Sequence, residues 1–398
     1  MTPSPLPDEG GIWYTLWTLT KMLFVLLIVG VIAILMLTSS QPTVTPSAAA
    51  MEGTSTAPPG TPTPGPTATS IPIPTQPPDA VVPFHLIYVQ GSTLYKLHGI
   101  DPPQELAPGP GVHEPAVAPD GTHLAYVRFQ KNYQDLFVLN LLTGKSTQIV
   151  NDAPNVAIDP RTGLTVGSPT WSPDGTMLYF SWNYPGMQAG GNQTDFRIFR
   201  CTVATTCDAN SAAALSDPNV TIQAGGNFEP VFRPGDPNTL IYTKYGYQTQ
   251  GADSRALGQI VAHDLTTGVE TSLTPLDATS QQQFSLSQPT WSPTGKFLAF
   301  VRTTADAQQS SIYVTAFHAP GDPQDYAHAK LLVQGAPFAA YPVFSPNGKY
   351  LAYIASGADG RLHLYIAHVY VGKQARLTHV EMVKRVNIVD GDRLAWTP

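Results

Sequence analysis

Cysteine, charge and basic clusters are all scarce in this chain. Two cysteines occur among its 398 residues, which excludes a disulfide-dense mini-domain and a four-cysteine zinc site. Charged residues make up 12% of the chain, against about 25% in typical soluble domains. The 21 lysines and arginines are scattered and the net charge is −7, so we expect no nucleic acid as a partner.

Sequence motifs for catalysis and for cofactor or metal binding are also missing. The sequence contains no H-E-x-x-H pair and no G-x-S-x-G elbow, and Gly144-Lys145-Ser146 lacks the upstream glycine of a phosphate-binding loop. The repeated Asp120 and Asp174 stand in Pro-Asp-Gly turns, so we interpret them as turn formers. The sequence therefore predicts no catalytic, cofactor-binding or metal-binding residue, and a protein that is not an enzyme.

One uncharged apolar run near the N-terminus predicts attachment to a membrane. Met22 to Leu37 carries no charge, and the aromatic boundary at Trp13 extends the apolar segment to residues 13–37. About 20 apolar residues are enough for a helix to cross a bilayer. No small-residue cleavage site follows, which favours an uncleaved signal-anchor over a signal peptide. Lys21 on the N-terminal side and no further lysine or arginine until Lys96 predict that residues 1–12 are a cytoplasmic tail and that the rest is extracytoplasmic.

A linker rich in proline and threonine follows the apolar run. Residues 42–83 contain twelve prolines and nine threonines and almost nothing that can fill a core. Proline favours the extended polyproline II conformation. We therefore expect residues 38–83 to be a disordered linker that holds a folded domain, residues 84–398, away from the membrane.

The rest of the chain consists of internal repeats. A short apolar strand, a Pro-x-Gly turn and a second strand recur, as in Ser168–Gly175 followed by Met177–Phe180. The turn prolines are Pro119, Pro173, Pro234, Pro293 and Pro346. Their spacing of 53 to 61 residues suits a four-stranded propeller blade with its loops.

These repeats resemble those of TolB-like β-propellers, bacterial relatives of WD repeats, whose hallmark is P-x-W-S-P-D-G followed by a short L-A-F strand. Trp171–Gly175 and Trp291–Gly295 match best, and the third repeat departs with Arg233-Pro-Gly-Asp236. The resemblance implies an all-β fold. TolB proteins carry a further N-terminal α/β domain, where this chain has the apolar run and the linker.

A degenerate sixth repeat ends the chain and predicts six blades. We interpret Val386–Gly391 as its first strand and Arg393–Trp396 as its second, with the missing partners supplied by Phe84–Leu106. Closure of the ring by both chain ends would leave no free sheet edge. Seven blades remain an alternative, because the N-terminal piece has room for three strands.

Long connections indicate a binding face. Between second and third strands they are 183–194, 245–257 and 303–310, and between fourth and first strands they are 151–167, 216–227 and 275–286. In a propeller both classes open on one face, and binding residues concentrate on variable loops held by a rigid scaffold. The candidate partner-binding residues on this face are Tyr184, Arg197, Tyr245, Tyr247 and Arg255.

Cys201 and Cys207 follow a predicted strand, and outside the cytoplasm we expect them to form a disulfide. The leading functional hypothesis is a membrane-tethered scaffold or adaptor that binds a protein, or alternatively a glycan, on the long-connection face. A propeller hydrolase or lyase with active residues in the channel is one alternative. A passive cell-surface protein is another.

Overall fold

The computed structural model describes residues 79–106, 109–130, 133–152, 165–183, 196–207, 212–215, 226–250, 253–273, 284–304, 306–318, 326, 328–371, 375–389 and 391–397, with the backbone alone for 247–250 and 253–256. None of the helical segments in these ranges has the length and apolar character needed to cross a membrane. The predicted tail (1–12), membrane helix (13–37) and all but the end of the predicted linker (38–83) lie outside the described residues.

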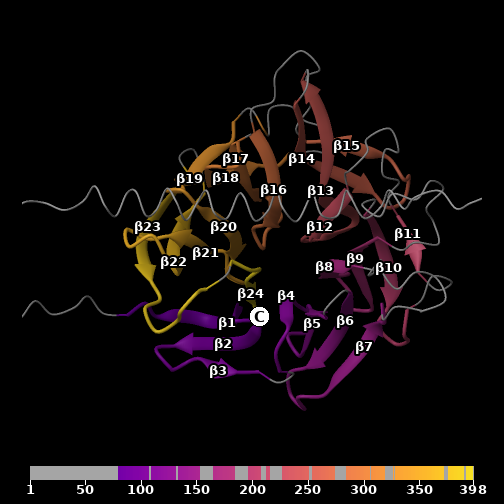
Figure 1. Ribbon diagram of the computed structural model, residues 1–398, viewed down its shortest axis with the longest axis horizontal. Coiled ribbons are helices and arrows are strands. Elements are labelled where there is room, and N and C mark those ends of the chain that lie inside the picture. Colours follow the sequence, from indigo (N-terminus) through magenta and orange to yellow (C-terminus); the bar gives the residue numbers. More distant parts are fainter. Residues whose placement is uncertain are drawn as a thin grey trace, which may run out of the picture. The chain divides into compact units, whose positions relative to one another are not determined.

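Six four-stranded antiparallel sheets form a ring, and each sheet is one blade (Figure 1). Blade 1 consists of β24 (Ala395–Trp396), β1 (Val82–Gln90), β2 (Thr93–Gly99) and β3 (Gln104–Glu105). Blade 2 consists of β4 (Val112–Val117), β5 (His123–Phe129), β6 (Gln134–Asn140) and β7 (Ser146–Val150). Blade 3 consists of β8 (Val166–Trp171), β9 (Met177–Trp182), β10 (Arg197–Thr202) and β11 (Ala213–Ala214).

The remaining blades follow the same order from the centre of the ring outward. Blade 4 consists of β12 (Gly226–Arg233), β13 (Asp236–Gln250), β14 (Asp253–Asp264) and β15 (Glu270–Ser272). Blade 5 consists of β16 (Phe284–Trp291), β17 (Phe297–Thr304), β18 (Ser310–Ala316) and β19 (Lys330–Val333). Blade 6 consists of β20 (Ala339–Phe344), β21 (Tyr350–Ser356), β22 (Leu362–Tyr370) and β23 (Arg376–Met382). The predicted all-β, six-bladed propeller is confirmed.

Both chain ends build blade 1, but not in the predicted proportion. The N-terminal piece supplies three strands and the C-terminus one, and β24 pairs with β1 as the innermost strand. The interpretation of Arg393–Trp396 as a second strand is therefore wrong. Trp396 Nε1 donates to the carbonyl of Val343 at 3.2 Å, as Trp171 Nε1 donates to that of Ala116 at 2.9 Å. Arg393–Trp396 thus matches the start of a repeat, where a first strand lies.

An ion pair reinforces this closure. Arg385 donates to the Oδ2 atom of Asp79 at 2.9 Å and to the carbonyls of Ala80 and Gly99 at 2.8 Å. Lys384 donates its backbone N–H to Asp79 Oδ1 at 2.7 Å. Burial opposes the ionised carboxylate, but the bonds from Arg385 and Lys384 prevail and lower the pKa of Asp79. Residues just before β1 are therefore fastened to the connection between β23 and β24.

Blade 4 differs from the others in the length of its central hairpin. Strands β13 and β14 remain paired out to Gln250 and Asp253, whereas β12 begins opposite Tyr245. Residues 246–250 and 253–257 therefore form a two-stranded extension, which we call the arm. The predicted loop over 245–257 is thus a β-ribbon. Similarly, the connection at 303–310 is shorter than predicted, because β17 runs to Thr304 and β18 starts at Ser310.

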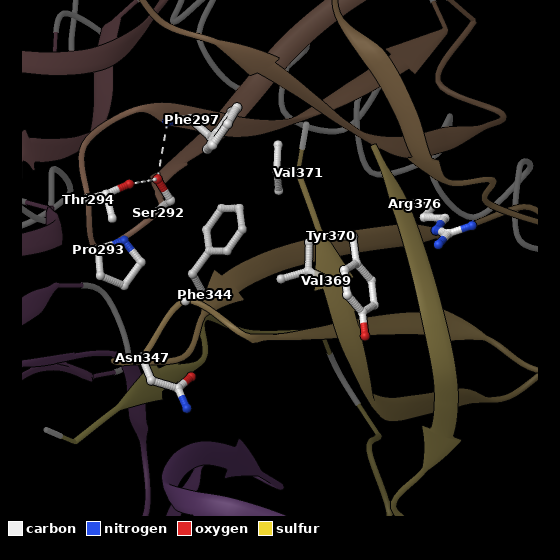
Figure 2. Close-up of a pocket in the computed structure, with 11 residues that line it drawn as sticks. Ser292, Pro293, Thr294, Phe297, Phe344, Asn347, Val369, Tyr370, Val371 and Arg376 are labelled. Atoms are coloured by element: carbon white, nitrogen blue, oxygen red, sulfur yellow. Dashed lines mark hydrogen bonds between the residues drawn. The ribbon is translucent and has the colours of Figure 1, made fainter. Parts of the chain in front are cut away.

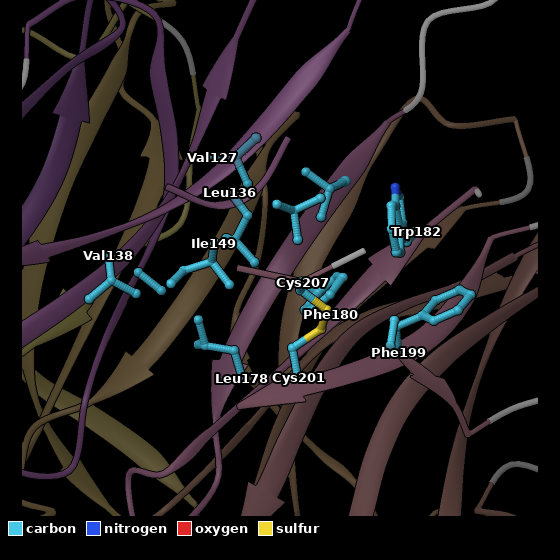
Figure 3. Close-up of a cluster of buried hydrophobic side chains, with 14 of the residues drawn as sticks. Val127, Leu136, Val138, Ile149, Leu178, Phe180, Trp182, Phe199, Cys201 and Cys207 are labelled. Carbon is cyan, nitrogen blue, oxygen red and sulfur yellow. A yellow bond between two sulfur atoms is a disulfide. The ribbon is translucent and has the colours of Figure 1, made fainter. Parts of the chain in front are cut away.

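The hydrophobic core lies between successive blades, and the junction of blades 2 and 3 contains the predicted disulfide (Figure 3). The bond between Cys201 and Cys207 is present, with the two Cα atoms 6.0 Å apart. Cys207 donates its backbone N–H to Ile149 at 2.7 Å and bridges Val150 at the end of β7. The disulfide therefore links β10 of blade 3 to a segment that lies against the outer strand of blade 2.

Replacement of both cysteines by serine should lower the free energy of unfolding by about 2 kcal/mol, because the crosslink restricts the unfolded chain over only a short loop. Urea unfolding of the oxidised wild type and the variant measures the difference. Dithiothreitol should shift the wild type to the variant's midpoint and leave the variant unchanged. Equal midpoints for the two oxidised proteins would contradict the prediction.

Candidate functional site

The innermost strands share an unusual backbone conformation at one position. The residue before proline has a positive φ in five blades, at Glu114, Ser168, Glu229, Gln288 and Tyr341, with values of 52° to 58°. Each lies where the pairing with the second strand skips two residues, which marks a β-bulge. A positive φ is uncommon outside glycine and costs free energy. Its recurrence shows that the repeat imposes the same side-chain direction in each of these blades.

These pre-proline side chains join neighbouring blades at the channel. Glu229 Oε2 accepts the backbone N–H of Gln288 at 2.6 Å, and Gln288 Oε1 accepts that of Tyr341 at 2.6 Å. The Glu114 carboxylate accepts the N–H of Ser168. In blade 1 the equivalent bond comes from Asp392, whose Oδ1 accepts the N–H of Glu114 at 3.0 Å. We use the name channel ring for the five pre-proline residues together with Asp392 and Arg393.

Arg393 takes the pre-proline position of blade 1, three residues before Trp396. Its Nη1 atom donates to the carbonyl of Pro169 in blade 3 at 3.1 Å, so the side chain reaches past blade 2. A cavity of about 90 Å³ lies beside it, and its polar lining includes Glu229, Gln288 and Tyr341. The cavity is therefore lined by one acidic side chain, Glu229, and one basic side chain, Arg393.

Burial disfavours the ionised form of the acidic groups in the ring and so raises their pKa values. It raises the pKa of Glu114 from 4.5 to about 6, and the nearby charge of Asp392 adds to the effect. Burial also raises the pKa of Glu229, although bonds from Gln288 and Thr243 oppose the shift. The pKa of Tyr341 rises to about 12 through burial and the charge of Asp392. Asp392 Oδ2 lies 2.9 Å from His113 Nδ1.

The ring presents carboxylates, an amide, a phenol and one guanidinium to a narrow channel, and so can hydrogen-bond small polar groups of either charge. Within the described ranges, no group of three or more His, Cys, Asp or Glu side chains is placed to hold a metal ion. The inner strands run from the long-connection face to the opposite face, which carries the short turns between first and second strands and which we call the tight-turn face. The ring residues lie near the middle of these strands.

One sequence-predicted candidate joins this ring. Tyr245 is hydrogen-bonded to Ser287, and burial and the charge of Glu229 raise the pKa of its hydroxyl. Arg197 opens β10 opposite Trp182. Tyr247 and Arg255 belong to the two strands of the arm, but their side chains are not described, and Tyr184 lies outside the described residues. A partner-binding role for these five residues stays a prediction.

Sequence reasoning missed the channel ring itself. The signal was present, because the residue before proline recurs at the same place in five repeats. Its identity varies from glutamate to serine, glutamine and tyrosine, which conceals the shared position. Variation at a fixed scaffold position is what distinguishes a lining residue from a turn former.

Comparisons with known proteins address the fold. The sequence matches no family model and no curated protein. Among solved structures, TolB from Acinetobacter baumannii matches with a TM-score of 0.54 at 18% identity, over 79% of this chain and 67% of that chain. The chain has a TolB-like six-bladed β-propeller fold.

Two further solved structures are more distant. A putative TolB from Agrobacterium tumefaciens has a TM-score of 0.48 at 16% identity, over 70% of this chain and 83% of that chain. An oligogalacturonate lyase in complex with manganese has a TM-score of 0.44 at 16% identity, over 69% of this chain and 68% of that chain. A shared fold alone does not establish a function, so enzyme activity stays unresolved.

Glu114→Gln should remove part of the pH dependence of stability. The folded chain binds the Glu114 proton more tightly than the unfolded chain, so the wild type loses stability as pH rises from about 4.5 through 6. Glutamine can still accept the Ser168 N–H but never ionises. At pH 7.5 the variant should be more stable by on the order of 1–2 kcal/mol, and at pH 4.5 about equal.

Urea unfolding at the two pH values measures this effect. Gln288→Glu is the matched control, since it adds a carboxylate at the equivalent ring position, and it should lose stability over the same pH range. The prediction fails if Glu114→Gln differs from the wild type by the same amount at both pH values.

Proposed function

We propose that this chain is a membrane-tethered, extracytoplasmic scaffold that binds another protein through the long-connection face. The observation that carries the proposal is the coincidence of two features on blade 4. The arm starts directly after Tyr245, and Tyr245 itself packs beside Glu229 of the channel ring. A partner seated on the arm would thus also reach the mouth of the channel.

The arm has the character of a docking element. It extends five residue pairs beyond the last pair that β12 shares with β13, so it stands on a rigid hairpin. Two predicted contact residues, Tyr247 and Arg255, belong to it, and tyrosine and arginine are the side chains that most often dominate interface energetics. Binding elements on rigid supports lose less conformational entropy on association than free loops do.

The tether rests on the sequence. The apolar run at Met22–Leu37 is long enough for a signal-anchor, and the linker that follows is extended by its prolines. A propeller held in this way would sample a large volume outside the membrane while remaining attached. Such a geometry suits an adaptor, because tethering raises the effective concentration of the scaffold for partners near the membrane.

Glu114 gives the enzyme alternative its best support. A carboxyl whose pKa is about 6 can accept or donate a proton near neutral pH. Glu114 also donates its backbone N–H to Asp392, which contacts His113. Loss of a turnover activity in Glu114→Gln, with partner binding unchanged, would favour a channel hydrolase or lyase.

Photo-crosslinking of the full-length chain in its native membrane tests the scaffold proposal. A benzoylphenylalanine at position 247 of the arm should give one saturable protein adduct, which excess unlabelled chain removes. The matched control is the same group at Thr147, an exposed residue on the outer strand of blade 2. Equal adducts from the two positions, or none from position 247, would contradict the proposal.

A second variant separates the arm from the ring. Joining Tyr245 to Gly258 through Asn-Gly removes the arm and leaves the pairing of β12 with β13 in place. This variant should lose the partner while its unfolding midpoint stays near that of the wild type. Retention of the partner would show that the channel mouth, or another surface, carries the binding.

A further inference from the structure

A groove lies between blades 5 and 6, beside the tight turns that join their first and second strands (Figure 2). It encloses about 690 Å³, within the range of binding pockets for small ligands or peptide side chains. Phe297, Phe344 and Val369 form its apolar part, and Ser292 and Asn347 of the two turns line one side. Figure 2 shows Tyr370 lying between the ring of Phe344 and Arg376.

The equivalent position at the previous junction is filled by the chain itself. Arg233 ends the first strand of blade 4 and Ser292 follows that of blade 5, and each stands directly before the turn proline. The guanidinium carbon of Arg233 lies 5.6 Å from the ring centre of Trp291 and 4.7 Å from that of Phe317. Its Nε atom donates to the carbonyl of Gly295 at 3.0 Å.

The three residues that Arg233 contacts have positional counterparts in the open groove, although Val369 stands where Phe317 supplies an aromatic ring. Phe344 corresponds to Trp291, since both end a first strand and pair with the leucine of the second. Val369 corresponds to Phe317, since each donates its backbone N–H to the lysine before the second strand, at 2.9 Å. Gly348 corresponds to Gly295, since each is the turn glycine of its blade and lies against the turn proline of the preceding blade. Gly295 lies against the carbonyl of Pro234, and Gly348 lies against the ring of Pro293.

The open groove keeps one of the two aromatic rings that a guanidinium contacts at the preceding junction, and the one charged side chain that lines it is Arg376. The face of an aromatic ring carries partial negative charge, and a planar cation over it is stabilised. The carbonyl of Gly348 accepts no hydrogen bond from any residue that the structure describes, whereas Gly295 receives one from Arg233. The groove thus offers the ring face of Phe344 and a vacant acceptor where the preceding junction holds a cation.

The positive charge of Arg376 would repel a cation in the groove, but Arg376 lies on the outer side of Tyr370. Its guanidinium carbon lies 5.6 Å from the Tyr370 ring centre, and Tyr370 is 51% exposed. A charge at so open a position is screened by water and salt. Lys349 beside Gly348 is exposed in the same way as Lys296 beside Gly295, and Arg233 occupies its junction in spite of that lysine.

We propose that the blade 5–6 groove binds an arginine side chain of a partner polypeptide, in the manner in which Arg233 occupies the blade 4–5 junction. Ser292 is too short to fill the space, and the remaining volume accommodates the residues that flank the incoming arginine. The site lies on the opposite face from the arm. Its test is therefore independent of the test of the scaffold proposal.

The chain's own sequence supplies the probe. The peptide acetyl-Val-Phe-Arg-Pro-Gly-amide copies residues 231–235, and its citrulline analogue keeps the shape without the charge. Titration of the full-length chain, followed by calorimetry or by nuclear magnetic resonance, should show weak, saturable binding of the arginine peptide. The citrulline peptide should bind about three- to fivefold more weakly, as expected for loss of an exposed cation–π contact.

Ser292→Arg is the decisive variant, because it installs the occupant that blade 4 already carries. It should weaken binding of the arginine peptide by about tenfold or more through direct competition for the groove. Phe344→Leu keeps the groove open without the ring face and should weaken binding about threefold. Arg376→Gln should strengthen it about twofold by removing the like charge. Circular dichroism and the urea midpoint confirm that each variant is folded.

Three results would overturn the proposal. They are absence of saturable binding at millimolar peptide, equal binding of the arginine and citrulline peptides, and unchanged binding in folded Ser292→Arg. Weaker binding in Arg376→Gln would also overturn it, because the groove would then prefer an anion.

Discussion

Closure of the ring is the constraint on which the rest of this structure depends. Blade 1 draws its innermost strand from the C-terminus, and the recorded pairing is short, from Leu86 to Trp396 and from Ile87 to Ala395. Two residue pairs alone give little stability. The bond from Thr397 N–H to the His85 carbonyl at 2.9 Å, the indole of Trp396 on Val343 and the Asp79–Arg385 pair all support the same junction. The channel ring exists only because this junction holds Arg393 and Asp392 in register with the other blades.

The pre-proline bulge converts that closed ring into a chemically variable channel. The repeats of blades 2 to 6 keep the strand and the turn, because those residues fill the core between blades and set the blade's path. The pre-proline residue is free to vary, because its side chain points past the sheet to the next blade. In this chain that freedom produced one glutamate, one glutamine, one tyrosine and one arginine around a small cavity. Some of these side chains also tie blades together, so a substitution there changes both stability and the chemistry of the channel.

Much of the fold could be predicted from the sequence, and the failures have physical reasons. The spacing of the turn prolines specified the blades because each turn needs its proline and glycine at fixed places. The last repeat lacks that proline, so Arg393–Trp396 was assigned to the second strand, although Trp396 occupies the first-strand position of Trp171. The sequence predicts a loop at the arm, because residues 246–257 are rich in Gly, Gln, Thr and Ser and carry little apolar alternation. Their strand structure comes from continuation of a long hairpin, which is a tertiary effect.

The candidate site was harder to predict for a different reason. Reasoning from loop length directs attention to residues that are exposed and variable, and Tyr245 was found in that way. The ring residues are variable but partly buried, and a single sequence does not distinguish a strained pre-proline residue from an ordinary strand residue. The blade 5–6 groove could not be predicted from the sequence either. Its significance comes from the contrast between Ser292 and Arg233, which fills the equivalent place at the preceding junction. Both features emerge when the blades are compared with one another, because five copies of one unit in one chain show which positions the fold fixes and which it leaves open to function.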